Sequence, residues 1–177
     1  KNDKLQAHVK YLFTHGALYT IVNGNLLFHG CIPMNEDGSF KEIEIDGKKL
    51  SGKLYMDYLD RKVRDAYFKP PKGQLPGING DLMWYLWLSE NSPLFGKDQM
   101  TTLERCLIDD KKPHKEHTVP YYSLIERRDI CEKILKEFGL NPDTSIILNG
   151  HVPVKIKDGE SPIKGEGKLF IIDGGMS

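Results

Sequence analysis

Two histidines, His29 and His151, each stand directly after a short apolar segment that is typical of a buried strand, and Asp173 follows a third such segment. In open α/β sheets, ligands collect beyond the carboxyl ends of the strands, because a rigid strand fixes the first loop residue in space. Imidazoles placed in this way can bind a metal ion. The three segments with their loops are 26–30 (LLFHG), 146–151 (IILNGH) and 170–174 (FIIDG).

The residues alone leave a second interpretation open for each position. A histidine after a strand is also common as a hydrogen-bonded loop residue, and an aspartate before Gly174-Gly175 is typical of a turn. Two imidazoles do not by themselves hold a catalytic divalent ion well, because such sites take at least three protein ligands, usually with a carboxylate among them. The metal-ligand interpretation of His29 and His151 therefore requires further ligands.

The elements that would position these residues alternate between strand and helix. Asn23-Gly24, between apolar segments, predicts a hairpin that leads into His29, because both turn positions need a positive φ. Asp46-Gly47 predicts a second hairpin over 41–53 with one exposed face. Buried strands are expected over 145–148 and 168–172. This pattern indicates an α/β fold and a single unit over residues 1–177.

Two helices with one buried face each are predicted near the N-terminus, over 4–13 and 54–68, from the helical spacing of their apolar residues. Pro70-Pro71 ends the second, since proline cannot continue a helix, and a loop follows to Gly80. The predicted buried faces are Leu5, Val9, Leu12 and Phe13 in the first helix, and Leu54, Tyr58, Leu59, Val63 and Tyr67 in the second.

Further along the chain, Asp81 is expected to cap a short helix over 82–88 whose tryptophans, Trp84 and Trp87, pack against the body of the domain. Residues 89–122 show little periodicity and predict loops and short helices. Ser123 precedes Glu126 by three positions, the spacing of a capping box, and predicts the start of another helix. Its expected inward residues are Ile130, Ile134, Leu135 and Phe138, with Gly139 at its C-terminal cap.

Composition narrows the class of protein. The 177 residues carry 25 basic and 25 acidic side chains, which disfavours a nucleic-acid partner. No apolar stretch is long enough to span a membrane, so no membrane partner is expected. Cys31, Cys106 and Cys131 are an odd number without CxxC spacing, which argues against a disulfide framework and favours the cytoplasm. The chain begins at Lys1 rather than at Met, and we expect it to be a piece of a longer polypeptide.

Several motifs carry a resemblance. The hairpin followed by His29-Gly30, together with Asn149-Gly-His-Val-Pro-Val and Ile172-Asp-Gly, resembles the second half of the calcineurin-like metallophosphoesterases. Over essentially the whole chain, the sequence is similar to the class III fructose-1,6-bisphosphatases of Firmicutes-type bacteria. The stretches that carry this similarity are 26–40 (LLFHGCIPMNEDGSF), 63–68 (VRDAYF), 92–98 (SPLFGKD) and 159–164 (GESPIK).

The resemblance implies the second half of a metallophosphoesterase sandwich, in which helices flank mixed sheets. It implies a Mn²⁺-dependent, two-metal hydrolysis of fructose 1,6-bisphosphate in gluconeogenesis, with an activated water rather than a protein group as nucleophile. His29 and His151 would be ligands of the same ion. The family's other ligand motifs, Asp-x-His, Gly-Asp-x-x-Asp-Arg and Gly-Asn-His, do not occur here, so the missing N-terminal half of the enzyme is expected to supply them. The isolated piece is then expected to be inactive, and Val152 replaces a threonine common in the wider group.

A sugar bisphosphate also needs cations near its phosphates. Arg105, Lys155 and Lys164 are the candidates, although a lone cation is usually a solvated surface charge. Cys31 is expected to be a small buried side chain, because an activated water makes a protein nucleophile redundant.

Other interpretations remain open at this stage. A phosphoprotein phosphatase or a dinucleoside polyphosphate hydrolase of the same fold would share the metal chemistry. A noncatalytic regulatory or interaction fragment would use the two histidines only to end strands. The sequence does not fix an oligomeric state and leaves a homo-oligomer open.

Overall fold

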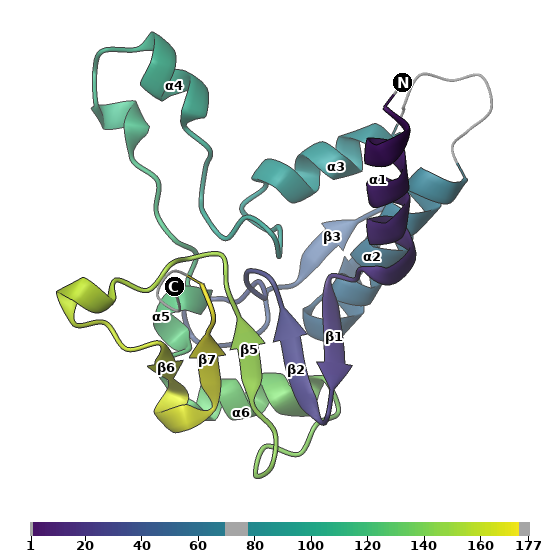
Figure 1. Cartoon of the computed structure of the whole chain (residues 1–177). Helices are drawn as coiled ribbons and strands as arrows, with labels where there is room; N and C mark the ends of the chain where they lie inside the picture. The colour runs from purple at the N-terminus through teal and green to yellow at the C-terminus, as the bar shows by residue number, and fades with distance from the viewer. Residues whose placement is uncertain (1, 70–77, 174–177) are drawn as a thin grey trace.

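The computed structural model describes residues 2–69 and 78–173, and its centre is a five-stranded sheet in the order β1-β2-β5-β7-β6 (Figure 1). β2, β5 and β7 run parallel, and β1 and β6 pair antiparallel at the two edges. The mixed α/β architecture predicted from the sequence is thereby confirmed. The strands are β1 (Tyr19–Val22), β2 (Asn25–Phe28), β5 (Ile147–Asn149), β6 (Ile163–Lys164) and β7 (Leu169–Ile171).

Both predicted hairpins are confirmed. Asn23 and Gly24 join β1 to β2 with φ values of 51° and 75°, so both turn residues are left-handed as the turn requires. Asp46 and Gly47 do the same, at 50° and 69°, between β3 (Ile43–Ile45) and β4 (Lys48–Leu50). This second hairpin forms a separate two-stranded sheet.

One face of the five-stranded sheet is buried in the core. The period of two along each strand sends alternate residues to the same face, and the residues on this face join the residues of α6 (Arg128–Glu137) in one apolar cluster. Figure 1 shows α6 lying across the sheet. The sheet residues on this face are Leu26, Phe28, Ile147, Leu169 and Ile171.

The predicted inward face of α6 is confirmed, but its predicted start is wrong. Ser123 does not cap the helix, because its hydroxyl donates to the carbonyl of Pro120. A separate short helix, α5 (Tyr121–Leu124), occupies that stretch, and α6 begins five residues beyond Ser123. At the other end Gly139 adopts a φ of +75° and, with Leu140, donates back to the last carbonyls of the helix. The buried residues of α6 are Ile130, Cys131, Ile134 and Leu135.

The two helices near the N-terminus are confirmed as α1 (Asp3–His15) and α2 (Gly52–Phe68), but their predicted buried faces are partly wrong. No residue of α1 is buried, because this helix lies at the edge of the molecule and meets α2 through the stacked rings of Phe13 and Tyr67. In α2, Tyr58 and Leu59 are buried as predicted, but Leu54 is 65% exposed and Tyr55 and Met56 are buried in its place. Pro70-Pro71 lies outside the described residues.

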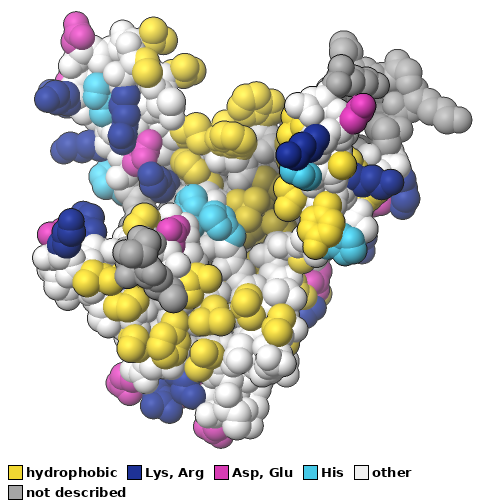
Figure 2. Space-filling model, viewed as in Figure 1, with side chains coloured by type: hydrophobic (Ala, Val, Ile, Leu, Met, Phe, Trp, Pro, Cys, Tyr) yellow, Lys and Arg dark blue, Asp and Glu magenta, His cyan; other side chains and the backbone are white. Residues whose placement is uncertain are grey.

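The aromatic helix is longer than predicted and differently oriented. α3 (Ile78–Leu88) begins before Asp81, so this aspartate lies in the first turn rather than at the cap. Trp84 and Trp87 are 66% and 67% exposed, which corrects the expectation that they pack against the body of the domain. Leu86 is the residue of α3 that enters the core, and Tyr85 packs against it. Figure 2 shows the resulting apolar surface along α3.

Residues 97–118 project from the domain as an arm, which a bridge between Lys97 and Thr118 closes at its base (Figure 1). The arm contains α4 (Thr102–Leu107) and a short 3-10 turn (Lys112–His114), as the weak periodicity of this region predicts. Further 3-10 turns occupy Ile156–Asp158 and Gly165–Gly167. Within residues 2–69 and 78–173, no helix combines the length and apolar character that crossing a bilayer requires.

Candidate metal centre

The pairing of β2 with β5 brings His29 and His151 together. Leu26 and Leu27 of β2 lie in parallel register with Ile147 and Leu148 of β5, so the two chains leave the sheet side by side. Gly150 continues this register by donating its N–H to the carbonyl of His29 at 2.9 Å. Both imidazoles therefore project from the carboxyl ends of adjacent strands, 122 positions apart in the sequence.

The two rings meet through one nitrogen each. Nε2 of His29 lies 2.9 Å from Nδ1 of His151, and the ring centroids are 4.8 Å apart. Nε2 of His151 lies 2.7 Å from the carbonyl oxygen of Phe95, which can only accept a hydrogen bond. The proton of neutral His151 is therefore on Nε2, and the lone pair of Nδ1 points at His29.

The surroundings of His29 favour the neutral form of its imidazole. Partial burial lowers the pKa of His29, the proximity of His151 lowers it further, and the charge of Asp173 opposes both effects. A lowered pKa leaves more of the ring unprotonated at neutral pH, which is the form that binds metals. The side chain of Asp173 also lies against Gly150, where a β-carbon would be 3.4 Å from its Cβ.

A third segment, residues 92–96, fixes the two histidine loops through its backbone carbonyls. The carbonyl of Pro93 accepts the N–H of Cys31 at 2.9 Å, and the carbonyl of Ser92 accepts its thiol at 3.5 Å. Phe95 supplies the carbonyl that orients His151. The backbone of Gly30 packs so closely that a β-carbon there would lie 2.6 Å from the oxygen of Pro93. This segment therefore holds both loops at a fixed separation.

His151 has an unusual backbone conformation, with a φ of +73°. Left-handed backbone is costly for a residue with a β-carbon, and such residues often occur at functional sites, where the surrounding structure holds them in place. Here the hydrogen bonds of the flanking Gly150 N–H and of the His151 ring itself hold this conformation.

Two histidines are a partial ligand set. In the part of the chain that the structure describes, no group of three or more His, Cys, Asp or Glu side chains is arranged to hold a metal ion. Two imidazole nitrogens about 2.1 Å from one ion lie about 3 Å apart when the angle between them is near 90°. The 2.9 Å between Nε2 of His29 and Nδ1 of His151 fits that requirement.

Comparison with known proteins gives one consistent result. The family described as Firmicute fructose-1,6-bisphosphatase matches residues 1–177. The chain belongs to this family. It is 53% identical, over 99% of its length, to "Fructose-1,6-bisphosphatase class 3" of Clostridium botulinum (strain Langeland / NCTC 10281 / Type F) and to the protein of the same name from Alkaliphilus metalliredigens (strain QYMF). No solved structure gives a significant match.

The similarity covers only part of the fructose-1,6-bisphosphatases that it identifies. The chain spans 26% of the Clostridium protein and 27% of the Alkaliphilus protein. About three quarters of each relative therefore lies outside the region that this chain represents.

In this member of the fructose-1,6-bisphosphatase family, two of the three cations predicted to bind phosphate are paired with other groups of the chain. Arg105 donates to Thr101 and to the carbonyl of His114 inside the arm. Lys164 forms an ion pair with Glu126 at the edge of the sheet, and Lys155 is exposed beyond the His151 loop. Cys31 is 1% exposed, and burial raises the pKa of its thiol to about 12. Only His29 and His151, among the predicted site residues, are brought into contact.

Two contributors to the site were not predicted from the sequence. The carbonyl of Phe95 has no signal in the residue types, because any residue carries a carbonyl. Asn149 was part of the quoted family motif, but no role was assigned to it. A signal did exist for this residue: it stands two positions after Ile147 in an apolar strand, so the period of two places a polar amide on the core face.

Proposed function

We propose that this chain forms part of the catalytic centre of an enzyme that hydrolyses fructose 1,6-bisphosphate to fructose 6-phosphate and phosphate, as a step of gluconeogenesis. The observation that carries this proposal is the 2.9 Å approach of His29 and His151 in a chain of the Firmicute fructose-1,6-bisphosphatase family. In our proposal both histidines bind one ion of a two-metal site, and segments outside residues 1–177 complete the ligand set.

The two ligands on this chain are both nitrogen donors. Imidazole nitrogens suit zinc, copper, iron and nickel ions, whereas carboxylate, carbonyl and water oxygens suit Mg²⁺, Ca²⁺ and Mn²⁺. Mn²⁺ is the ion that the resemblance implies, and we propose it here together with oxygen ligands from segments outside residues 1–177. When bound, the ions would supply electrostatic stabilisation of the phosphoryl oxygens and a lowered pKa for the attacking water.

The residues of this chain then have defined tasks. His151 presents Nδ1, because the carbonyl of Phe95 holds the proton on Nε2. His29 presents Nε2, which requires its proton to lie on Nδ1 when the ion is bound. A protein nucleophile is not needed, and the raised pKa of Cys31 keeps that thiol protonated. Lys155 is exposed near the His151 loop and is the cation of this chain that we propose for phosphate binding.

The second face of the five-stranded sheet is suited to packing against another layer. Opposite its buried face, register places Leu27, Leu148, Phe170 and Ile163 in one row across the strands. These residues are half-buried or exposed, and Figure 2 shows apolar side chains on this side of the molecule. We propose that a second sheet, formed by the part of the family that lies outside this chain, covers the row. The exposed thiol of Cys106 fits a reducing compartment, and we propose the cytoplasm.

The test uses the full-length enzyme. We expect His29→Ala and His151→Ala each to lower both Mn²⁺ affinity and turnover of fructose 1,6-bisphosphate by more than about 100-fold, since even outer partners of metal ligands are worth about 10–100-fold. His8→Ala, which removes an exposed histidine on α1, is the matched control and should change neither value. Mn²⁺ binding is measured by calorimetry and turnover by phosphate release.

Two results would contradict the proposal. Normal turnover in both strand-end variants would remove the histidines from the site. Comparable turnover of phosphopeptides or dinucleoside polyphosphates by the unmodified enzyme would instead overturn the substrate assignment.

A further inference from the structure

A buried amide connects the two histidine loops. Asn149 is 1% exposed and precedes Gly150-His151 at the end of β5. Its Nδ2 donates to the carbonyl of Gly30, the residue after His29, at 3.1 Å, and to the hydroxyl of Tyr121 at 2.9 Å. One side chain therefore links the loop that carries His151 with the loop that carries His29 and with helix α5.

The orientation of this amide is determined by its partners. The Gly30 carbonyl can only accept a hydrogen bond, so the NH₂ group of Asn149 must face it and Oδ1 must face the other way. Oδ1 is buried and has no hydrogen-bond partner among the residues that the structure describes. Tyr121 is fully buried, and burial raises the pKa of its hydroxyl far above the usual range, so it stays protonated.

Packing alone does not explain an asparagine at this position. The neighbouring core positions of the sheet, Ile147 and Ile171, are apolar and β-branched, as is favourable in a buried strand. An amide with an unsatisfied oxygen costs free energy there. Asn149 donates two hydrogen bonds, one to the loop of His29 and one to α5. An apolar residue in its place could make neither.

We infer that Asn149 is a positioning residue, whose amide clamps the His29 loop to the His151 loop and thereby sets the separation of the two ring nitrogens for ion binding. This inference rests on the proposed function. The clamp works together with the hydrogen bond from Gly150 N–H to the carbonyl of His29, so the two loops are linked at two successive carbonyls, those of His29 and Gly30.

The experiment measures Mn²⁺ binding to the full-length enzyme by the loss of the free-ion signal in electron paramagnetic resonance. Asn149→Asp keeps the shape of the side chain but replaces the donor with an oxygen. We expect the half-saturating Mn²⁺ concentration to rise about 10–100-fold, as for other partners of metal ligands. Asn149→Val also removes the donor and suits a buried strand, so it should fold and show a rise of about 10-fold or more.

A control separates positioning from stability. Ile134→Val removes a methyl group from the core of α6, away from both loops, and should lower the thermal midpoint without changing Mn²⁺ affinity. A purely structural role of Asn149 predicts the same behaviour for its variants. Binding is therefore measured on the folded fraction of each variant. If Asn149 positions the histidines, its variants should lose less kcat at saturating Mn²⁺ than they lose in Mn²⁺ affinity.

The outcomes are distinguishable with His151→Ala measured in parallel. Loss of affinity in both the Asn149 and the His151 variants supports the inference. Unchanged affinity in both Asn149 variants, with loss in His151→Ala, overturns the positioning role alone. Unchanged affinity in all three overturns the proposed function and this inference with it.

Discussion

The end of the sheet and the arm position their polar side chains by different interactions. At the sheet end, backbone pairing between β2 and β5 and the buried residues beneath them position His29 and His151. The arm, residues 97–118, buries little apolar surface, and Leu103 and Leu107 of α4 are 70% and 78% exposed. The sheet end is therefore stabilised by apolar burial and backbone pairing, whereas the arm is stabilised by charged and polar contacts.

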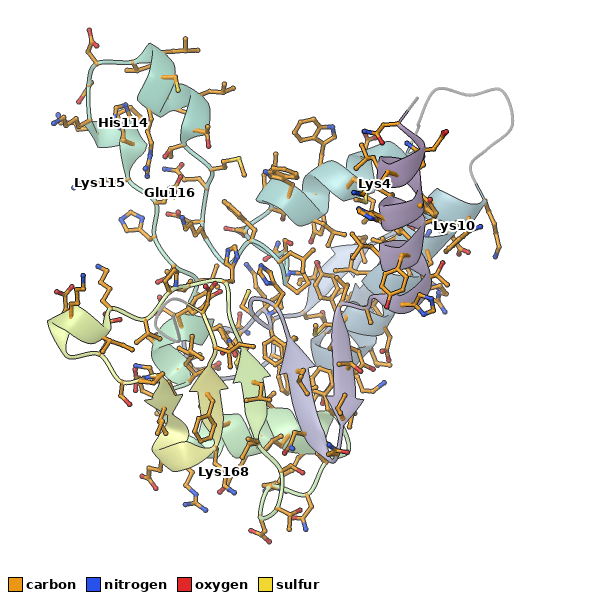
Figure 3. All side chains as sticks on the ribbon, in the orientation of Figure 1. Lys4, Lys10, His114, Lys115, Glu116 and Lys168 are labelled. Atoms are coloured by element: carbon orange, nitrogen blue, oxygen red, sulfur yellow. The ribbon has the colours of Figure 1, made fainter. Side chains whose placement is uncertain are left out.

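Glu116 is the centre of the polar network in the arm. Its carboxylate accepts from the N–H of Thr101 at 3.0 Å and from the Thr101 hydroxyl at 2.8 Å, and it pairs with Lys97 at 2.7 Å and with Arg105 at 3.6 Å. Figure 3 shows Glu116 inside the arm, close to its base. These contacts lower the pKa of Glu116 to about 2, with the Lys97 hydrogen bond as the largest cause.

The largest effect is expected at the sheet. Ile147→Ala removes a fully buried side chain from the central region, and we expect a loss of about 2–5 kcal/mol in the free energy of opening of β2, β5 and β7. Hydrogen exchange of these strands in the full-length protein measures it. The arm should exchange as before, and a comparable change there would show that the two regions unfold together.

A smaller effect is expected from Glu116→Gln in the arm. The glutamine keeps an acceptor for Thr101 but loses the charge that holds Lys97 and Arg105, which is worth about 1–2 kcal/mol. Amide exchange in residues 97–118 should accelerate about 5–30-fold. Exchange in the sheet should not change, so faster exchange in β5 would contradict the separation of the two regions.

Acid should act on the arm in the same direction. The folded pKa of Glu116, about 2, lies below the ordinary value of 4.5, so this residue stabilises the arm fully above pH 4.5 and loses that contribution as the pH falls toward 2. Asp98, whose pKa is lowered mainly by hydrogen bonds from the backbone and ring of His117, adds to this loss. Exchange in the arm, corrected for the intrinsic rate, should rise over this window, and the rise should be smaller in Glu116→Gln. An equal rise in both proteins would assign the acid response to other groups.

The sequence predicted the sheet well because its signals are local. Asn23-Gly24 and Asp46-Gly47 fix their turns through the φ values that they require, and the apolar runs before His29 and His151 mark strands regardless of context. That the two imidazoles meet follows from one further rule, that parallel strands share an edge at their carboxyl ends.

The errors arose where tertiary contacts override a local pattern. Ser123 and Glu126 have the spacing of a capping box, but their side chains bond elsewhere. The Ser123 hydroxyl donates to the carbonyl of Pro120, and the Glu126 carboxylate accepts from Lys164. The aromatic residues of α3 suggested a buried helix, yet Trp84 and Trp87 face outward because Leu86 occupies the inward position. The contact of His151 with Phe95 joins residues 56 positions apart, and no pattern in either segment announces it.

The support for the histidine loops from residues 92–96 has a consequence for how this protein responds to substitution. The hydrogen bonds that these residues make with the two loops end on carbonyl oxygens, at Ser92, Pro93 and Phe95. Alanine scanning changes side chains and keeps those oxygens, so it would report on the packing of this segment, such as the buried Ser92 hydroxyl that donates to Leu86, and not on its hydrogen bonds with the loops. Insertion or deletion of a single residue there would displace all three oxygens at once and expose its role.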